Sequence, residues 1–259
     1  MKWLRNEWYC FCTALMFFTR IPIPFYLPYN ETLMNKSQKY YPWVGLGIGV
    51  LNAIVLFVGQ HLFGLVPALV VMMCFSVLLT GAFHEDGFVD VCDSFGGGYG
   101  KNRILTIMKD SRVGAYGAIG IVLLFMLKLA SLYELNILNA PIYLILIFAH
   151  TCSRFISGTT VYTYAYVQDI DVSKSKPIAS GSLPTWTLAV GATAIILPFL
   201  FSRQYIFLVL FLPAYISKIG LARYFKRHIG GYTGDCLGAI QQVSEVVIYL
   251  SAVCLMKYT

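Results

Sequence analysis

The chain has 259 residues, of which 58% are hydrophobic and 12% are charged, and its formal net charge at pH 7 is +7. Soluble domains are about half apolar and about a quarter charged, so this composition excludes a water-soluble globular protein. The basic residues form no stripe and no helix-turn-helix pattern, which argues against nucleic acid as a partner.

Long apolar segments predict an all-α fold, a polytopic integral membrane helical bundle. A helix needs about 20 apolar residues to cross a bilayer, and several segments reach that length. We expect about seven or eight membrane helices, within the apolar segments 8–19, 43–63, 65–83, 116–135, 141–163, 185–201, 204–222 and 239–256. No repeat and no linker divides the chain, so residues 1–259 are expected to form a single membrane-embedded catalytic domain.

The first apolar segment differs from the others in its length and its flanks. Lys2 and Arg5 precede a short apolar run, as in a signal peptide, but Glu7 and the missing small-residue cleavage site argue against removal. If this helix spanned the membrane, its basic end would lie on the wrong side. We therefore expect a retained helix at the membrane interface, followed by a Pro-rich loop at 21–28.

The connections between the later segments predict the orientation of the bundle. Basic residues gather in the loops 20–42, 84–115, 164–184 and 223–238, whereas the alternate connections contain only Arg203. Under the positive-inside rule the four basic loops face the cytoplasm. We expect a multi-pass protein embedded in the lipid bilayer, with its chemistry on the cytoplasmic side.

An acidic cluster directly follows the third apolar segment. Five of the 12 acidic residues fall where an even spread would place about one, namely Glu85, Asp86, Asp90, Asp93 and Asp110. If the apolar helix continues, Asp86, Asp90 and Asp93 are at i, i+4 and i+7 on one face. Their mutual repulsion needs a partner, and no Lys or Arg occurs between Lys39 and Lys101.

A divalent cation would neutralise this cluster. Carboxylate oxygens suit Mg²⁺ or Mn²⁺, which usually keep some water and share the site with substrate phosphate. We therefore expect the acidic cluster, with Glu85 in it, to hold metal. A solvated acidic helix end and a cation path in a transporter remain alternatives.

The residues after the carboxylates indicate phosphate. Four glycines at 96–100 would let backbone approach a ligand closely, although a flexible loop has the same composition. Arg103, Lys109 and Arg112 can neutralise phosphate, although positive-inside anchors would look the same. Beside the carboxylates, the combination predicts a phosphate bridged by metal.

A second polar island at 230–238 lies on the same predicted side of the membrane. Thr233 and Asp235 belong to it, and the alternatives are a helix cap or a substrate or metal contact. His84 adjoins the acidic cluster, and is a candidate base with a structural role as the alternative.

Four more polar residues lie within apolar segments. His150 and Arg154 are one turn apart and are expected to face the bundle interior, with Arg154 a candidate substrate contact. For Lys128 and Lys218 we expect snorkelling to the membrane surface or misplaced segment ends.

Three stretches resemble the cobalamin synthase family, also called adenosylcobinamide-GDP ribazoletransferase. They are GAFHEDGFVDVCD at 81–93, RILTIMKDSRVGAYG at 103–117 and GGYTGDCLGA at 230–239. The opening FFTRIPIP at 17–24 is also similar to the N-terminal pattern of that family. The resemblance extends over nearly the whole chain, with the motifs in order.

The resemblance implies a reaction and a cofactor. α-Ribazole, or its 5′-phosphate, attacks the cobinamide-bound phosphate of adenosylcobinamide-GDP, GMP leaves, and adenosylcobalamin or its 5′-phosphate forms, with Mg²⁺ as the implied cofactor. On this basis we assign Asp86, Asp90 and Asp93 to metal, and Asp110 to a further ligand or the base that accepts the ribazole hydroxyl proton. Arg103, Lys109 and Arg112 would hold phosphate.

Two other classes of protein are alternatives. A CDP-alcohol phosphatidyltransferase also uses membrane carboxylates and metal, but its pattern needs an Ala-Arg pair after Asp-Gly, which is missing after Asp86-Gly87. A cation-coupled transporter should have polar residues at several mid-membrane positions, whereas here most lie at segment ends. A homo-oligomer is compatible with either class.

Overall fold

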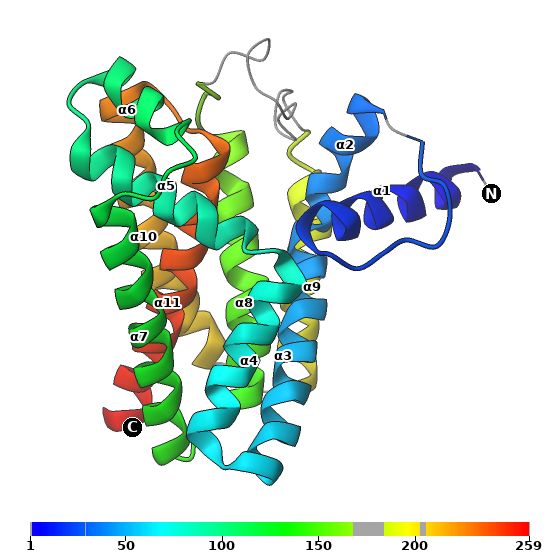
Figure 1. Ribbon diagram of the computed structural model, residues 1–259. Helices are drawn as coiled ribbons and strands as arrows, with labels where there is room; N and C mark the ends of the chain where they lie inside the picture. Colours follow the sequence, from blue (N-terminus) through cyan, green and yellow to red (C-terminus); the bar gives the residue numbers. More distant parts are fainter. Residues whose placement is uncertain (1, 29, 168–183, 203–205, 259) are drawn as a thin grey trace.

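The computed structural model describes residues 2–28, 30–167, 184–202 and 206–258 (Figure 1). In chain order its helices are α1 (Lys2–Phe18), α2 (Glu31–Ser37), η1 (Gln38–Tyr40), α3 (Tyr41–Phe63), α4 (Leu65–Thr80), α5 (Phe83–Gly97), α6 (Lys101–Met108), α7 (Ala115–Ile137), α8 (Ile142–Gly158), η2 (Thr159–Tyr162), α9 (Thr187–Ser202), α10 (Ile206–Ile229) and α11 (Gly234–Tyr258). Within the described residues the only β-type pairing is one isolated bridge between Tyr166 and Tyr232. The all-α prediction is confirmed.

Several helices are long and apolar enough to cross a membrane. By length and composition they are four in the described residues: Glu31–Phe63, α7, Ile142–Tyr162 and α11. The bent pair of α4 and α5 would make a fifth. Helices α1, α4 and α9 are shorter than these four, with 17, 16 and 16 residues. The prediction of a polytopic membrane bundle is confirmed.

Apolar side chains cover the outside of the bundle as well as its core. The core contains large buried residues of several helices, such as Leu56, Leu69, Phe148 and Tyr249. Exposed apolar side chains continue around the outside, among them Leu62, Leu78, Ile119, Leu123 and Leu212. A soluble protein rarely exposes so continuous an apolar surface, so the outer side chains are suited to lipid.

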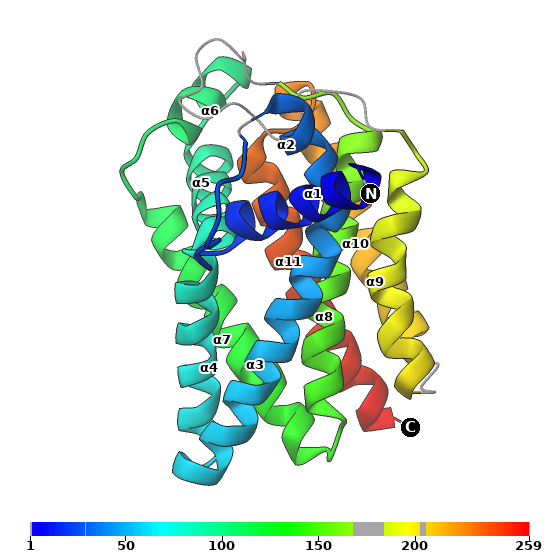
Figure 2. The ribbon, with the colours of Figure 1, turned by 90° about the vertical axis from the view of Figure 1, so that its right-hand side faces the viewer.

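The connections divide between the two ends of the bundle. The α3–α4 and α7–α8 turns lie at one end, and α5, α6 and the start of α11 lie toward the other (Figures 1 and 2). Helix α1 runs across the bundle near this second end, as expected of a helix at the membrane interface. It is tied to the bundle through Glu7, whose carboxylate Oε2 lies 2.6 Å from Lys39 Nζ.

Helix α11 lies at the centre of the packing that positions the site. It packs against α5, α7, α8 and α10. Its first turn is at the same end as α5, while its middle passes between α7 and α8. Residues on α11 can therefore contact both the acidic motif and the interior of the bundle.

Candidate active site

The acidic motif lies on α5, which begins after a sharp break in the chain. Gly81 caps the end of α4 and Ala82 precedes α5, with φ of 66° and 58°. This left-handed conformation suits glycine and is strained for alanine, so the surrounding structure must hold it in place. The axes of α4 and α5 differ by 91°. The apolar helix therefore does not continue unbroken into the motif, and α5 alone gives Asp86, Asp90 and Asp93 the spacing considered in the sequence.

Three carboxylates from two helices lie around the point where α5 crosses the start of α11. Asp86 is exposed and Asp90 is half-buried one turn further along α5. Asp235 is half-buried in the first turn of α11. The charges of Asp235 and Asp86 both act on Asp90, and that of Asp86 acts on Asp235. We call Asp86, Asp90 and Asp235 the acidic triad.

Two glycines allow the two helices to approach closely at this crossing. A Cβ atom on Gly87 would lie 2.9 Å from Asp235 Cα, and one on Gly238 would lie 3.0 Å from the carbonyl oxygen of His84. These neighbours are backbone atoms, which cannot move aside as a flexible side chain can. The sequence therefore places glycine where the backbones of α5 and α11 touch, and this contact brings Asp235 beside the α5 carboxylates.

Thr233 has the role of a helix cap in the second polar island. It is fully buried, and its Oγ1 accepts a hydrogen bond of 3.3 Å from the backbone N–H of Cys236. This is the pattern of a residue that caps the first turn of a helix. Thr233 fixes where α11 begins, and so places Asp235 in the first turn, where the helix dipole favours negative charge.

Asp93 of α5 is buried against the start of α7, and its carboxylate accepts hydrogen bonds from two backbone N–H groups. Its Oδ2 accepts a hydrogen bond of 2.7 Å from the Gly114 N–H, and its Oδ1 accepts one of 2.8 Å from the Gly117 N–H. Both donors belong to the first turn of α7, where backbone N–H groups have no partner within the helix. Asp93 thus fastens α7 to α5.

Glu85 points into the bundle. Its residue is only 9% exposed, and its Oε1 accepts a hydrogen bond of 2.9 Å from Gln242 Nε2 on α11. Successive residues of a helix are about 100° apart, so Glu85 and the exposed Asp86 face different directions. The structure therefore does not bring Glu85 together with the acidic triad.

The acidic triad suits a metal that is shared with substrate. No group of three or more His, Cys, Asp or Glu side chains in the described residues converges closely enough to hold a metal ion. Mg²⁺ is usually bound through one or two carboxylates, with water and substrate phosphate completing its octahedral shell. The donor set thus fits Mg²⁺ bound jointly with a phosphate, and it does not fit a site closed by protein ligands.

Asp110 and Arg112 form an ion pair in the loop between α6 and α7. Arg112 Nη2 lies 2.6 Å from Asp110 Oδ2, and Arg112 Nε and its backbone N–H also donate to Asp110 Oδ1. These hydrogen bonds hold the pKa of Asp110 at about 2, below its ordinary value of 3.8. Asp110 is therefore ionised at neutral pH, and Arg112, whose side chain is 87% exposed, can reach an incoming ligand.

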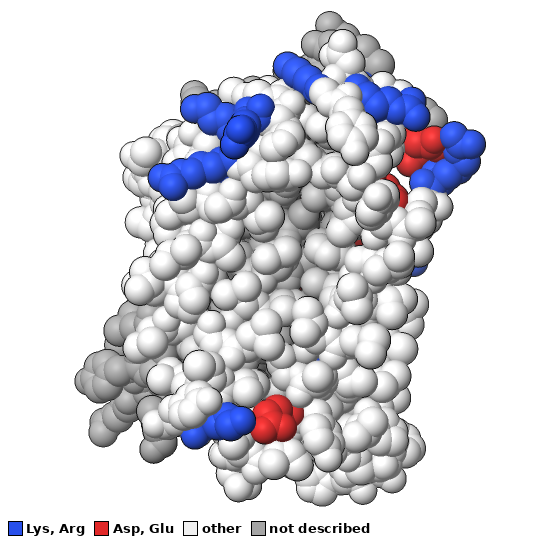
Figure 3. All heavy atoms as spheres, turned by 90° about the vertical axis from the view of Figure 1, so that its left-hand side faces the viewer, with Lys and Arg blue, Asp and Glu red and all other residues white. Residues whose placement is uncertain are grey.

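The remaining predicted phosphate-binding residues are also exposed at this end. Arg103 lies on α6 and Lys109 is the residue that caps it, and both are exposed. Lys and Arg side chains gather mainly at the end of the bundle with α5 and α6, where acidic side chains lie beside some of them (Figure 3). The basic and acidic groups of the motif therefore share one end of the molecule, as the sequence predicted.

His84 is buried among aromatic rings. It is 1% exposed, its Nε2 shares a hydrogen bond with the Tyr41 hydroxyl, and its ring stacks on Phe18 and Tyr41. This environment favours the structural alternative for His84, because the ring lies inside the bundle and not beside Asp86.

The structure also places four charged or polar residues of the apolar segments. Arg154 is 2% exposed and its Nη1 donates to the His150 carbonyl oxygen at 3.0 Å, so both face the interior as predicted. Lys128 does not snorkel: its Nζ lies 2.7 Å from Glu245 Oε1, and both side chains are buried. Lys218 is 2% exposed, with its Nζ 5.2 Å from the Tyr215 ring centroid. The snorkelling expectation is wrong because both lysines are buried, Lys128 against a carboxylate and Lys218 against aromatic rings.

The sequence was compared with family models, curated proteins and solved structures. A model of the Cobalamin-5-phosphate synthase family matches residues 10–253. The chain belongs to this family.

Curated relatives of the cobalamin-5-phosphate synthase family resemble the chain along nearly its whole length. An adenosylcobinamide-GDP ribazoletransferase of Vibrio parahaemolyticus is 42% identical over 252 residues, which is 96% of this chain and 94% of the relative. Relatives of the same name from Shewanella frigidimarina and Vibrio cholerae are 41% and 38% identical, and cover 96% and 98% of this chain. No solved structure matches the chain significantly. The family resemblance in the sequence is thus confirmed, and with it the class of enzyme, a transferase.

Proposed function

We propose that this transferase joins α-ribazole, or its 5′-phosphate, to adenosylcobinamide-GDP and releases GMP. The observation that carries the proposal is the match to relatives named adenosylcobinamide-GDP ribazoletransferase over 96% of the chain. The acidic triad supports it independently, because displacement of a nucleotide from a diphosphate needs negative charge to be neutralised. The product would be adenosylcobalamin or its 5′-phosphate.

The proposed reaction is a displacement at phosphorus. A hydroxyl oxygen of the ribazole forms a bond to the cobinamide-linked phosphorus, and the bond from that phosphorus to the bridging oxygen breaks. GMP leaves with the bridging oxygen, and the hydroxyl proton passes to a base on the enzyme. No oxidant or reductant is required.

We assign the acidic triad to Mg²⁺ and the basic residues to the diphosphate. Asp86 and Asp90 would hold Mg²⁺ together with substrate oxygens. The negative charge of Asp235, which acts on Asp90, would add to the attraction for the metal. Bound Mg²⁺ would neutralise the charge of the substrate diphosphate and the negative charge that develops on GMP as it leaves. Asp93 remains a candidate Mg²⁺ ligand, because each of its carboxylate oxygens has a lone pair that the backbone hydrogen bonds do not use.

The α6–α7 region would bind the diphosphate and take the proton. Arg103, Lys109 and Arg112 are exposed and can donate hydrogen bonds to phosphate oxygens, Arg in a bidentate manner. Asp110 is the proposed base, since it is ionised and its ion pair with Arg112 would place it beside the bound phosphate. We place this end of the bundle at the cytoplasmic face of a bacterial inner membrane, because the basic residues of α6, of the loop after it and of the last turn of α10 lie there.

Release of GMP by the purified protein tests the proposal. The protein in lipid nanodiscs is supplied with adenosylcobinamide-GDP, α-ribazole and Mg²⁺, and GMP and the corrinoid product are measured by chromatography. We expect GMP and product in equal amounts, and none when Mg²⁺ is removed by chelation. Absence of GMP with every divalent metal, or turnover of a CDP-alcohol substrate in its place, would overturn the proposal.

A further inference from the structure

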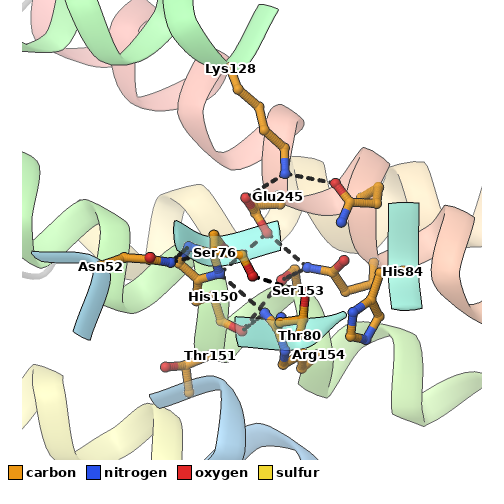
Figure 4. A network of polar contacts seen from close by, with 12 residues as sticks. Asn52, Ser76, Thr80, His84, Lys128, His150, Thr151, Ser153, Arg154 and Glu245 are labelled. Carbon is orange, nitrogen blue, oxygen red and sulfur yellow. Dashed lines mark hydrogen bonds and ion pairs between the residues drawn. The ribbon is translucent and has the colours of Figure 1, made fainter. Parts of the chain in front are cut away.

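A cluster of charged and polar side chains lies inside the bundle, away from the acidic triad (Figure 4). Glu245 of α11 is at its centre: its Oε1 lies 2.7 Å from Lys128 Nζ, and its Oε2 accepts a hydrogen bond of 2.8 Å from Gln241. His150 Nδ1 lies 3.5 Å from Glu245 Oε2, and Arg154 donates to the His150 carbonyl oxygen. Helices α7, α8 and α11 all contribute to this cluster.

A chain of three contacts connects the cluster to the helix with the acidic motif. Besides contacting Glu245, Lys128 Nζ donates a hydrogen bond of 2.7 Å to Gln242 Oε1. The amide nitrogen of the same Gln242 donates a hydrogen bond of 2.9 Å to Glu85 Oε1. We call Lys128, Gln242 and Glu85 the buried relay. It runs from α7 through α11 to α5, and it ends one residue before Asp86.

Packing alone does not account for polar groups at these positions. Glu85, Lys128 and Gln242 are 9%, 6% and 1% exposed. Charged side chains inside a membrane bundle are costly, and well-packed apolar residues often give equal or greater stability. A hydrogen bond adds direction, because the Gln242 amide on α11 can donate to Glu85 only while α5 turns this residue toward α11.

That rotation decides where the neighbouring carboxylates point. With Glu85 held against α11, Asp86 is exposed and Asp90 lies within the field of Asp235. A turn of α5 by one residue, about 100°, would point Asp86 into the bundle, in the direction that Glu85 has now. Gly87 and the backbone contacts of Asp93 also restrict this rotation. The hydrogen bond from Gln242 adds a restraint on the residue directly before Asp86.

We propose that the buried relay is a positioning device that fixes the rotation of α5, so that Asp86 and Asp90 face Asp235. This inference rests on the proposed function only in taking the acidic triad as the metal site. Glu85 is then a positioning residue whose hydrogen-bond acceptor matters, and it is not a metal ligand. One oxygen of Glu85, Oε2, is buried without a hydrogen-bond partner among the described residues, so the relay uses only Oε1.

The proposal makes different predictions for two substitutions at one position. Glu85→Gln keeps an acceptor oxygen for Gln242 but would be a poor metal ligand, whereas Glu85→Leu removes the acceptor. Two quantities are measured in nanodiscs: Mn²⁺ affinity in the presence of GDP, from the resonance of free Mn²⁺, and hydrogen exchange of the α5 amides. Neither readout requires turnover.

We expect Glu85→Gln to remain within about threefold of the unsubstituted protein in Mn²⁺ affinity, and Glu85→Leu to lose about 10- to 100-fold, as for other residues that orient ligands. Exchange of the α5 amides should rise in Glu85→Leu while protection of α8 is unchanged. Gln242→Leu should have the same two effects, and combining it with Glu85→Leu should add little. Gln60→Leu is a matched control, because it removes a bundle amide that bonds Asn136 and Tyr143 instead.

Two results would overturn the proposal. Loss of Mn²⁺ affinity in Glu85→Gln as large as in Asp86→Asn would make Glu85 a ligand. Unchanged affinity and exchange in both Glu85→Leu and Gln242→Leu would remove the positioning role. GMP release by the unsubstituted protein tests the proposed function separately, so failure of that assay leaves these two readouts interpretable.

Discussion

Asp93 shows how a carboxylate in an acidic motif can have a structural role. Its two oxygens accept hydrogen bonds from the Gly114 and Gly117 N–H groups, and the residue is 9% exposed. Sequence spacing placed it on the same face as Asp86 and Asp90. It could not show that the start of a helix 21 residues later in the chain would use it as a cap.

Substitution of Asp93 should therefore lower the stability of the fold even when no metal is bound. We expect Asp93→Ala to lower the free energy of unfolding by about 1–2 kcal/mol, as for the loss of other helix caps. Denaturant unfolding in micelles with a chelator present measures this change. Asp86→Asn, at an exposed position, serves as the control and should change stability by less than about 0.5 kcal/mol. Equal stability of Asp93→Ala and the unsubstituted protein would contradict the capping role.

Asp110 permits a prediction about pH. Because Arg112 depresses its folded-state pKa to about 2, the contribution of this pair is fully present above the ordinary value of 3.8 and is lost as the pH falls through about 2. The acid limb of kcat/KM above pH 5 should therefore not come from Asp110, and it should be the same in Arg112→Gln. Asp110→Asn should lower kcat by about 10²- to 10⁴-fold if Asp110 is the base.

The pH profile of the Arg112→Gln variant tests whether Asp110 is ionised throughout the working pH range. Arg112→Gln should bind the diphosphate more weakly and raise KM, while the position of the acid limb stays constant. An acid limb that moves by about one pH unit in this variant would show that Asp110 titrates near neutral pH during turnover.

At the scale of elements, the contact between α5 and α11 is the most restrictive feature of the site. A Cβ on Gly87 would lie 2.9 Å from Asp235 Cα and 3.1 Å from the Asp235 carbonyl oxygen. The two backbones cannot accept this atom unless the helices separate. Gly97, at the other end of α5, has no atom within 4 Å of its Cβ position.

This pair of glycines forms a matched test. We expect Gly87→Ala to lower kcat/KM by about tenfold or more, because separation of α5 from α11 misplaces the acidic triad. Gly97→Ala should leave kcat/KM unchanged, since its methyl group meets open space. Steady-state GMP release with Mg²⁺ measures both. If Gly87→Ala keeps full activity, the close approach of the helices is not needed for the site.

Most helices were predictable from sequence because apolar composition is sufficient to identify them. Each of the eight predicted apolar segments overlaps a helix, and the described loops divide between the two ends as the basic residues indicated. Most of the predicted loop 164–184, and Arg203, lie outside the described residues. Helix α5 was harder to predict. Its break depends on an alanine in a left-handed conformation, which no residue preference indicates.

The buried relay could not be predicted, because its partners are far apart in the chain. Glu85 and Gln242 are 157 residues apart, and Lys128 and Gln242 are 114 apart. The only local signal was that Gln241, Gln242 and Glu245 interrupt an apolar segment. The snorkelling prediction for Lys128 overlooked its place in the buried relay, because periodicity shows which face a residue occupies and not which partner lies there.

At the scale of the whole molecule, the orientation in the membrane remains a prediction. Basic residues gather at the end of the bundle with α5 and α6, whereas α11 ends at the opposite end (Figure 1). In a variant without native cysteines, we expect Lys101→Cys to react with a membrane-impermeant maleimide only from the cytoplasm. Lys257→Cys should react only from the periplasm, and the reverse pattern would contradict the proposed cytoplasmic site.

Catalysis is proposed to depend most directly on Asp86 and Asp90, the two α5 carboxylates beside Asp235. GMP release from adenosylcobinamide-GDP and α-ribazole at saturating Mg²⁺, by the unsubstituted protein and by Asp86→Asn and Asp90→Asn, is the decisive measurement. We expect GMP and corrinoid product in equal amounts from the unsubstituted protein, and at least about 10²-fold slower turnover in each variant, with folding unchanged. Near-normal turnover by either variant would contradict this proposal.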